Sequence, residues 1–196
     1  VGMTERPDTL CGKISEGRIA ILVDGTPNAL IVPYFFVEYF QHLDDYSMHS
    51  YLATFTRWLK YMAFFISTLL PGLYVGISTF NPEILPGPIL SKIALAVGTT
   101  PFSLMFETII IHLIYEVMRE AGLRIPRPLG HAVSIVGALV IGETAVSAGL
   151  IGAPTLMVVA LTAISSYVIP NLYEPISILK FAFIIVGGLL GIWGIM

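Results

Sequence analysis

Long apolar stretches, separated by prolines, glycines and few charges, make up most of the chain from residue 61 onward. Within residues 131–196 the formally charged side chains are Glu143, Glu174 and Lys180. A helix needs about 20 apolar residues to cross the hydrocarbon core of a bilayer, and it must close its backbone hydrogen bonds within the segment. The pattern therefore predicts an all-α integral membrane protein, a polytopic helical bundle of about four or five spans.

The first candidate span covers residues 61–80, and Pro71-Gly72 inside it predicts a kink or a break. Further candidate spans follow at 102–121, 131–150, 155–169 and 177–196. The stretch 89–121 also fits a short helix followed by a re-entrant or interfacial helix. Arginines cluster between Arg119 and Arg127, and short basic loops stay on the cytoplasmic side, together with residues 1–30 here.

The N-terminal part has a different pattern. Residues 18–32 contain two apolar, β-rich runs separated by Asp24-Gly25 and a proline, which predicts a hairpin. We assign residues 1–33 to the end of a cytosolic domain and 34–60 to an interfacial and juxtamembrane helical segment that opens with an aromatic cluster. Residues 61–196 form the transmembrane domain, and the chain is expected to be truncated at both ends of a longer protein.

Two expectations concern the juxtamembrane segment. Asp44 or Asp45 is expected to cap a helix that runs from about residue 46 toward the first span. Arg57 and Lys60 precede the apolar stretch, and we expect both to anchor phospholipid headgroups.

The composition and the missing motifs exclude several classes of function for this chain. The chain is 56% hydrophobic and 12% charged, and its net charge of −3 argues against a nucleic-acid partner. Cys11 is the single cysteine, so no disulfide framework is expected. The sequence lacks a phosphate-binding glycine loop, a His-x-x-x-His pair and a Gly-x-Ser-x-Gly elbow. We therefore expect no enzyme, catalytic residue, cofactor or metal site.

Residues 131–150, taken as a helix, carry small side chains within about 80° of one another at 100° per residue. Such a ridge lets helix backbones approach closely and predicts a packing face. Its members are Ser134, Ala138, Gly142, Ala145 and Gly149.

The opposite face of the same helix combines two valines with a carboxylate and a hydroxyl: Val136, Val140, Glu143 and Ser147. In copies arranged around an axis, these positions would form hydrophobic constrictions and an acidic ring, the chemistry of a cation pathway. The alternative is that Glu143 is protonated, hydrogen-bonded within a monomer, or close enough to the interface to be wet.

A polar stripe lies on the helix expected at 102–121. His112, Glu116 and Arg119 fall within about 60° of one another, with Glu120 at the edge and Glu107 on the opposite side. The stripe fits a proton relay or a substrate site. An internal ion-pair network, with Glu116 and Arg119 spaced i, i+3, is the favoured interpretation.

Three stretches carry a resemblance to a known family: GRIAILVDGTPNALIVP at 17–33, residues 44–86, and LRIPRPLGHAVSIVGALVIGETAVSAGLIGAP at 123–154. The chain resembles the A-subunit family of bacterial spore germination receptors, which includes GerA-type A subunits and the stage V sporulation protein SpoVAF. The order and spacing of proline, glycine, aspartate and arginine positions carry this resemblance across nearly all of residues 17–196. From the resemblance, an uncharged amide is expected in many relatives at the position of Glu143.

The resemblance implies a multi-pass protein of the spore inner membrane that takes part in nutrient-triggered germination. It implies a homo-oligomer that forms or gates a channel for monovalent cations, beside a transporter-like B subunit and a lipoprotein C subunit. Two other functions stay open: an assembly or signalling subunit without a pore, and a secondary transporter with broken helices near Pro71-Gly72 and Gly152-Ala153-Pro154.

Overall fold

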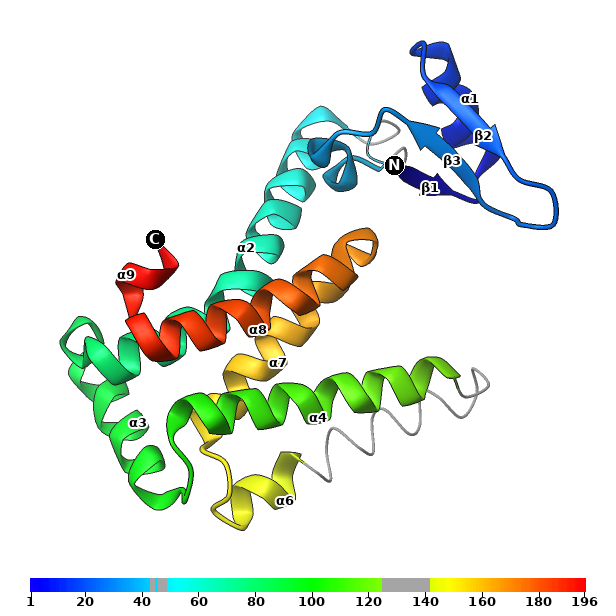
Figure 1. The fold of residues 1–196 in the computed structure, drawn as a ribbon. Helices are drawn as coiled ribbons and strands as arrows, with labels where there is room; N and C mark the ends of the chain where they lie inside the picture. Colours follow the sequence, from blue (N-terminus) through cyan, green and yellow to red (C-terminus); the bar gives the residue numbers. More distant parts are fainter. Residues whose placement is uncertain (43–44, 46–48, 125–141) are drawn as a thin grey trace. The chain divides into compact units, whose positions relative to one another are not determined.

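The computed structural model describes residues 1–42, 45, 49–124 and 142–196 (Figure 1). The chain divides into two compact units, Val1–Tyr61 and Met62–Met196. Each unit has its own core, and each is described here by itself.

The first unit contains a three-stranded antiparallel sheet with the strand order β1-β3-β2. Its elements are β1 (Gly2–Thr4), α1 (Pro7–Ser15), β2 (Ile19–Leu22) and β3 (Ala29–Val32). β2 and β3 pair with Ile19 opposite Val32, so the predicted hairpin is confirmed, and Gly25 takes a positive φ of 83° in the connection. The pattern did not predict α1 or β1, which is three residues long and adds to the far side of β3.

The segment after the sheet contains the 3₁₀ helix η1 (Phe36–Phe40). Phe40 is completely buried and stacks on Tyr61 with 4.4 Å between the ring centroids. Phe35 and Phe36 are exposed, so the predicted aromatic cluster is divided between the core of this unit and its surface.

Two expectations for the juxtamembrane segment are wrong. α2 begins at Ser50, so Asp45 is not its N-cap. Asp45 accepts hydrogen bonds from the Lys60 ammonium at 2.8 and 3.0 Å and from the His42 N–H. Lys60 is buried in this pair and is not a headgroup anchor, because the nearby carboxylate supplies the counter-charge inside the protein.

The other described residues are mostly helical. Its elements are α2 (Ser50–Phe80), η3 (Pro82–Ile84), α3 (Gly87–Thr99), α4 (Leu104–Arg124), α6 (Gly142–Ser147), α7 (Ala153–Tyr167), η5 (Pro170–Leu172), α8 (Tyr173–Leu190) and α9 (Ile192–Ile195). α2 continues through Pro71, so the predicted break is absent. α8 ends at Leu190, because Gly191 takes a positive φ of 65°.

In the described residues, two helices are long and apolar enough to cross a membrane: Ser50–Phe80 and Pro170–Leu190. α3 and α4 bend by 81° at their break, and they add a third candidate if the bent pair is one span. The predicted alternative of a short helix followed by a re-entrant or interfacial helix stays a prediction, because the bend also fits one broken span. α7, with 15 residues, is shorter than a span. The count of four or five spans stays a prediction, and most of the helix expected at 131–150 lies outside the described residues.

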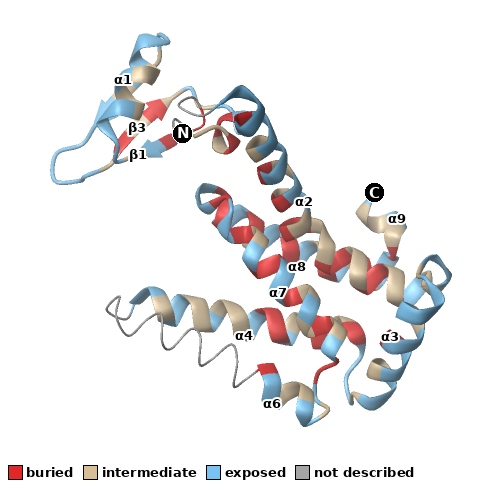
Figure 2. Ribbon diagram, turned by 180° about the vertical axis from the view of Figure 1, so that it is seen from behind, coloured by how far each residue is buried: buried red, intermediate tan, exposed pale blue. Residues whose placement is uncertain are grey.

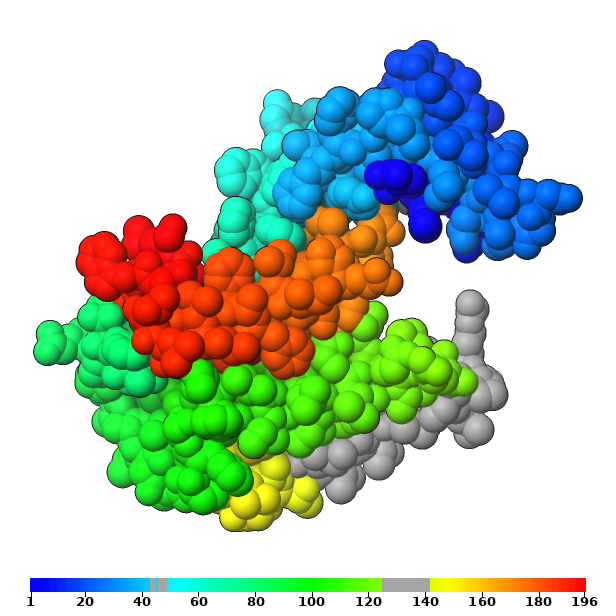
Figure 3. Space-filling view, in the orientation of Figure 1, coloured from blue at the N-terminus to red at the C-terminus, as the bar shows by residue number. Residues whose placement is uncertain are grey.

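The core of the second unit lies between α2, α4, α7 and α8, and Figure 2 shows buried positions on α7, α8 and the first half of α4. Val75, Leu104 and Ile184 form one apolar cluster, and Ile111 and Val159 belong to another. In the space-filling view, α8 lies along α4 (Figure 3). This packing brings the polar side chains of α4 against α8.

Glycines set the spacing between α2 and α8. A Cβ added at Gly72 would lie 2.5 Å from the carbonyl oxygen of Phe183, and one added at Gly187 would meet the backbone of Gly72. Gly76 approaches Gly191 in the same way. α2 thus presents the Gly-x-x-x-Gly pair Gly72/Gly76 to Gly187 of α8 and to Gly191, the residue at which α8 ends.

Candidate functional site

The polar stripe of α4 is organised around Glu116. Its Oε1 accepts hydrogen bonds from the Lys180 ammonium and from the Ser177 hydroxyl at 2.9 Å. Its Oε2 accepts a hydrogen bond from the Tyr173 hydroxyl at 2.6 Å. All three donors come from α8, so one carboxylate of α4 ties together about two turns of the facing helix.

Lys180 gives this cluster its electrostatic character. Its side chain is 2% exposed and its ammonium pairs with Glu116, whose side chain is 18% exposed. A charge placed in hydrocarbon without a partner is costly, whereas a paired and hydrogen-bonded charge is tolerated. Lys180 is therefore retained inside an apolar helix because Glu116 faces it.

Arg119 completes the Glu116 cluster. Its guanidinium lies 3.8 Å from Glu116 and 3.0 Å from the ring centroid of Tyr173, in the geometry of a cation–π contact. Next to it, the Tyr115 hydroxyl donates to the Tyr167 hydroxyl of α7 at 2.8 Å. The i, i+3 pair of Glu116 and Arg119 expected from the sequence is present. The Lys180 ammonium of α8, however, lies closer to the Glu116 carboxylate than Arg119 does.

His112 and Glu120 occupy different environments. His112 is 1% exposed and packs edge-on against Phe181, and among the described residues neither ring nitrogen has a hydrogen-bond partner. Glu120 is exposed and pairs with Arg124 at 2.7 Å, one turn along α4. The stripe therefore ends at Arg119 as an internal network, and Glu120 belongs to the surface.

The Glu116 carboxylate has donors on both oxygens, so its lone pairs are committed to protein groups. An ion in transit would have to displace one of these donors. The arrangement is that of a clamp between α4 and α8. Within the residues that the structure describes, no group of three or more His, Cys, Asp or Glu side chains is placed to hold a metal ion.

The predicted pore helix is only partly described. Val136, Val140, Ser134 and Ala138 lie outside the described residues, so their roles stay predictions. On α6, Glu143 and Ser147 are exposed, whereas Gly142 is buried.

Two ridge positions of this helix contact the chain's own helices. A Cβ at Gly142 would lie 3.4 Å from the side chain of Leu156 on α7. Ala145 packs against the apolar cluster that contains Ile111. Gly149 lies beyond the end of α6 with a positive φ of 67°, so the helix ends earlier than expected and Gly149 is not part of a helical ridge.

Sequence reasoning missed the two features that hold the second unit together. Lys180 was recognised as a rare charge but was not matched with Glu116, because the pairing of α4 with α8 cannot be derived from periodicity. The Gly-x-x-x-Gly spacing of Gly72/Gly76 and of Gly187/Gly191 is a recognisable signal in apolar sequence and could have been found, although Gly191 lies at the end of α8 and not within it.

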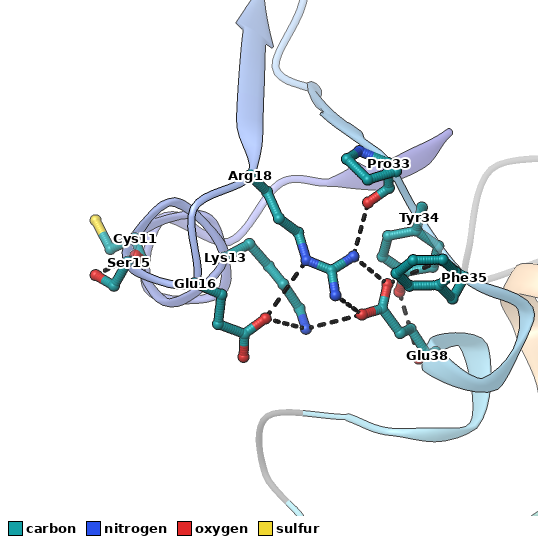
Figure 4. Close-up of polar contacts among 9 residues, drawn as sticks. All are labelled: Cys11, Lys13, Ser15, Glu16, Arg18, Pro33, Tyr34, Phe35 and Glu38. Carbon is teal, nitrogen blue, oxygen red and sulfur yellow. Dashed lines mark hydrogen bonds and ion pairs between the residues drawn. The ribbon is translucent and has the colours of Figure 1, made fainter.

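A second carboxylate cluster lies in the first unit (Figure 4). Glu38 accepts hydrogen bonds from the Arg18 guanidinium at 2.7 Å and from the Phe35 N–H at 3.1 Å, and Lys13 lies 3.4 Å away. Burial raises the pKa of Glu38, but the hydrogen bonds and the two cations outweigh it and hold the pKa below its ordinary value. The cluster joins α1, the hairpin and η1.

In the part of the chain that the structure describes, these features define a mostly helical protein with two or three candidate membrane spans and a small N-terminal sheet. A family model described as Bacillus/Clostridium GerA spore germination protein matches residues 1–196, and the chain belongs to this family. No solved structure matches the chain significantly.

Three relatives give the degree of similarity. Spore germination protein KA of Bacillus subtilis (strain 168) is 44% identical over 98% of this chain and 36% of its own length. The uncharacterized membrane protein YfkQ of the same organism is 40% identical over 98% of the chain and 38% of its own length. Spore germination protein GerLA of Bacillus cereus is 37% identical over 98% of the chain and 40% of its own length. The chain thus spans less than half the length of these relatives.

Proposed function

We propose that this chain is part of the membrane subunit of a spore germination complex, which oligomerises and forms or gates a cation-release channel in response to germinant. The subunit lies in the spore inner membrane as a multi-pass protein with residues 1–30 in the cytosol. It works beside a transporter-like B subunit and a lipoprotein C subunit, and it performs no catalysis.

The exposure of Glu143 and Ser147 on α6 is the observation that carries this proposal. The same short helix turns Gly142 inward, against Leu156 of α7. A carboxylate on the outside of an apolar helical unit needs water or a polar partner. Identical helices around an axis would supply both, because their carboxylates would line a wet lumen that favours cations.

Glu143→Gln in the full-length subunit tests the proposal in spores. The substitution removes the charge and keeps the size, so we expect slower release of monovalent cations after germinant is added. Glu174→Gln is the matched control, because Glu174 is an exposed carboxylate in the first turn of α8. Equal release in both variants and in the wild type would exclude Glu143 from the pathway.

A secondary transporter is the second candidate, and the 81° bend between α3 and α4 favours it. Transporters place substrate sites where membrane helices are interrupted. Saturable uptake of a solute by the reconstituted subunit would support this function, whereas a passive cation conductance would support the channel.

A further inference from the structure

Glu107 is a buried carboxylate on α4 that takes no part in the Glu116 cluster. It is 1% exposed, and its Oε1 accepts a hydrogen bond from the Gly152 N–H at 2.8 Å. Its second oxygen has no hydrogen-bond partner among the described residues. A carboxylate buried in this way needs a structural or functional reason.

The hydrogen bond lies at the N-terminus of α7. Gly152 is the N-cap residue of this helix and has no side chain with which to cap it. The start of a helix carries unpaired N–H groups and a partial positive charge, so a carboxylate stabilises it. Glu107 thus supplies from α4 an acceptor for the N–H of the N-cap residue, the bond that a Glu at the third helical position makes in a capping box.

The connection that Glu107 holds is short and tightly bonded. The carbonyl of Ala145 on α6 accepts hydrogen bonds from the N–H groups of Leu150 at 3.0 Å and Ile151 at 3.3 Å. The Ile151 side chain is 6% exposed and packs in the cluster that contains Ile111. These hydrogen bonds and this packing therefore fix the position of Gly152 relative to the end of α6 at Ser147.

The same glycine also touches α3. A Cβ at Gly152 would lie 3.2 Å from the Cβ of Ala96 and 3.4 Å from Glu107 Oε1. Gly152 therefore sits where the two arms of the bent α3–α4 pair meet the α6–α7 connection. A change in the bend would be transmitted to α6 through this contact.

We propose that Glu107 is a positioning residue, a latch whose hydrogen bond to Gly152 holds the α6–α7 connection on α3 and α4 and thereby sets the position of Glu143 and Ser147. The proposal rests on the proposed function, in which α6 faces the cation pathway. It assigns Glu107 no contact with the ion.

Disulfide formation between Ala96→Cys and Gly152→Cys, introduced into full-length protein that carries Cys11→Ser, reports the position of the connection. The Cβ separation is close to the 3.5 to 4.5 Å range of disulfides, so the pair should oxidise readily. We compare Glu107, Glu107→Gln and Glu107→Ala. In Glu107→Gln the amide oxygen can still accept the hydrogen bond from the Gly152 N–H, so the rate of disulfide formation should stay unchanged. Ala leaves the N–H unpaired, and we expect the rate to fall about tenfold.

Glu83→Ala is the control for the loss of a carboxylate, because Glu83 is exposed in η3. Equal rates with Glu, Gln and Ala at position 107 would overturn the latch. A rate with Gln as low as that with Ala would overturn it too, because the hydrogen bond would then not be the cause. If the Ala variant does not accumulate in the membrane, Glu107→Asp replaces it, since its shorter side chain cannot reach Gly152.

Cation release separates the two proposals. In otherwise native full-length protein, Glu107→Ala should alter release after germinant, whereas Glu107→Gln should leave it near wild type. If oxidation slows in Glu107→Ala while release stays unchanged, the latch stands and the placement of the pathway along α6 is contradicted.

Discussion

The Glu38 and Glu116 clusters use the same chemistry in two different settings. Each carboxylate accepts several hydrogen bonds and has two cations nearby, Arg18 and Lys13 in the first case and Lys180 and Arg119 in the second. Glu38 belongs to the small sheet unit, where Arg18 and Lys13 also pair with the exposed Glu16. Glu116 faces an apolar helix that is a candidate membrane span.

The difference shows how surroundings set the cost of separating the charges of a pair. At the sheet unit, water can solvate Arg18 or Lys13 when the carboxylate is removed. Lys180 has no such substitute, because its side chain is 2% exposed within α8. The Glu116 cluster should therefore tolerate removal of one partner far less well.

The largest effect is expected from Glu116→Leu in the full-length protein. It leaves the Lys180 ammonium buried without its anion, which should lower the free energy of unfolding by about 3–5 kcal/mol. Adding Lys180→Met should recover most of that loss, because an apolar pair needs no counter-charge. Unfolding by detergent titration measures both variants. A double variant no more stable than Glu116→Leu alone would contradict the comparison.

Gly72→Ala tests whether the α2–α8 contact holds the Glu116 cluster in place. The new Cβ would press on the Phe183 carbonyl, three residues after Lys180, and should cost about 1–3 kcal/mol. Gly98→Ala is the matched control, because no atom lies within 4 Å of its added Cβ. The same detergent titration compares the two variants. Equal stability would show that the close contact between α2 and α8 does not contribute to the stability of the protein.

How far the sequence alone predicts the structure differs between the two units. The hairpin followed from two β-rich runs and a turn, since these are local signals. The helical, apolar character of the second unit also followed from composition. α1 and β1 did not, because a nine-residue helix and a three-residue strand carry little pattern of their own.

The same limit applies to the polar residues. His112, Glu116 and Arg119 were placed on one face because helical periodicity fixes that relation. Lys180 as the partner of Glu116 depends on which helices pack together, which periodicity within one helix does not contain. Lys60 was assigned to lipid for the same reason, since its partner Asp45 lies 15 residues earlier in the chain.

Acid should destabilise the first unit through Glu38. The pKa of this carboxyl is held below its ordinary value of 4.5 in the folded protein. The stabilisation is therefore complete above pH 4.5 and is lost as the pH falls through the lower folded value. Hydrogen exchange of β3 and η1, corrected for intrinsic rates, should show this loss.

Glu38→Gln provides the matched control for the acid effect. It should reduce protection at neutral pH, at a cost of about 1–2 kcal/mol, and should flatten the pH dependence. A pH profile that Glu38→Gln leaves unchanged would assign the acid effect to another group.

The smallest effect is expected at Glu120. Its ion pair with Arg124 is exposed and spaced i, i+4, so Glu120→Gln should change stability by no more than about 0.5 kcal/mol. Detergent titration beside Glu116→Leu measures the contrast on one helix. A loss of stability as large as that of Glu116→Leu would show that burial of an ion pair does not set the cost of breaking it.

The most direct test of the proposed function is the reversal potential of the full-length complex in a planar bilayer under a potassium chloride gradient. The account predicts a germinant-dependent conductance whose reversal potential lies close to that of potassium. It also predicts that Glu143→Gln moves this potential toward zero and that Glu174→Gln does not. A conductance with no cation preference, or one that Glu143→Gln leaves unchanged, would contradict the assignment of α6 to the cation pathway.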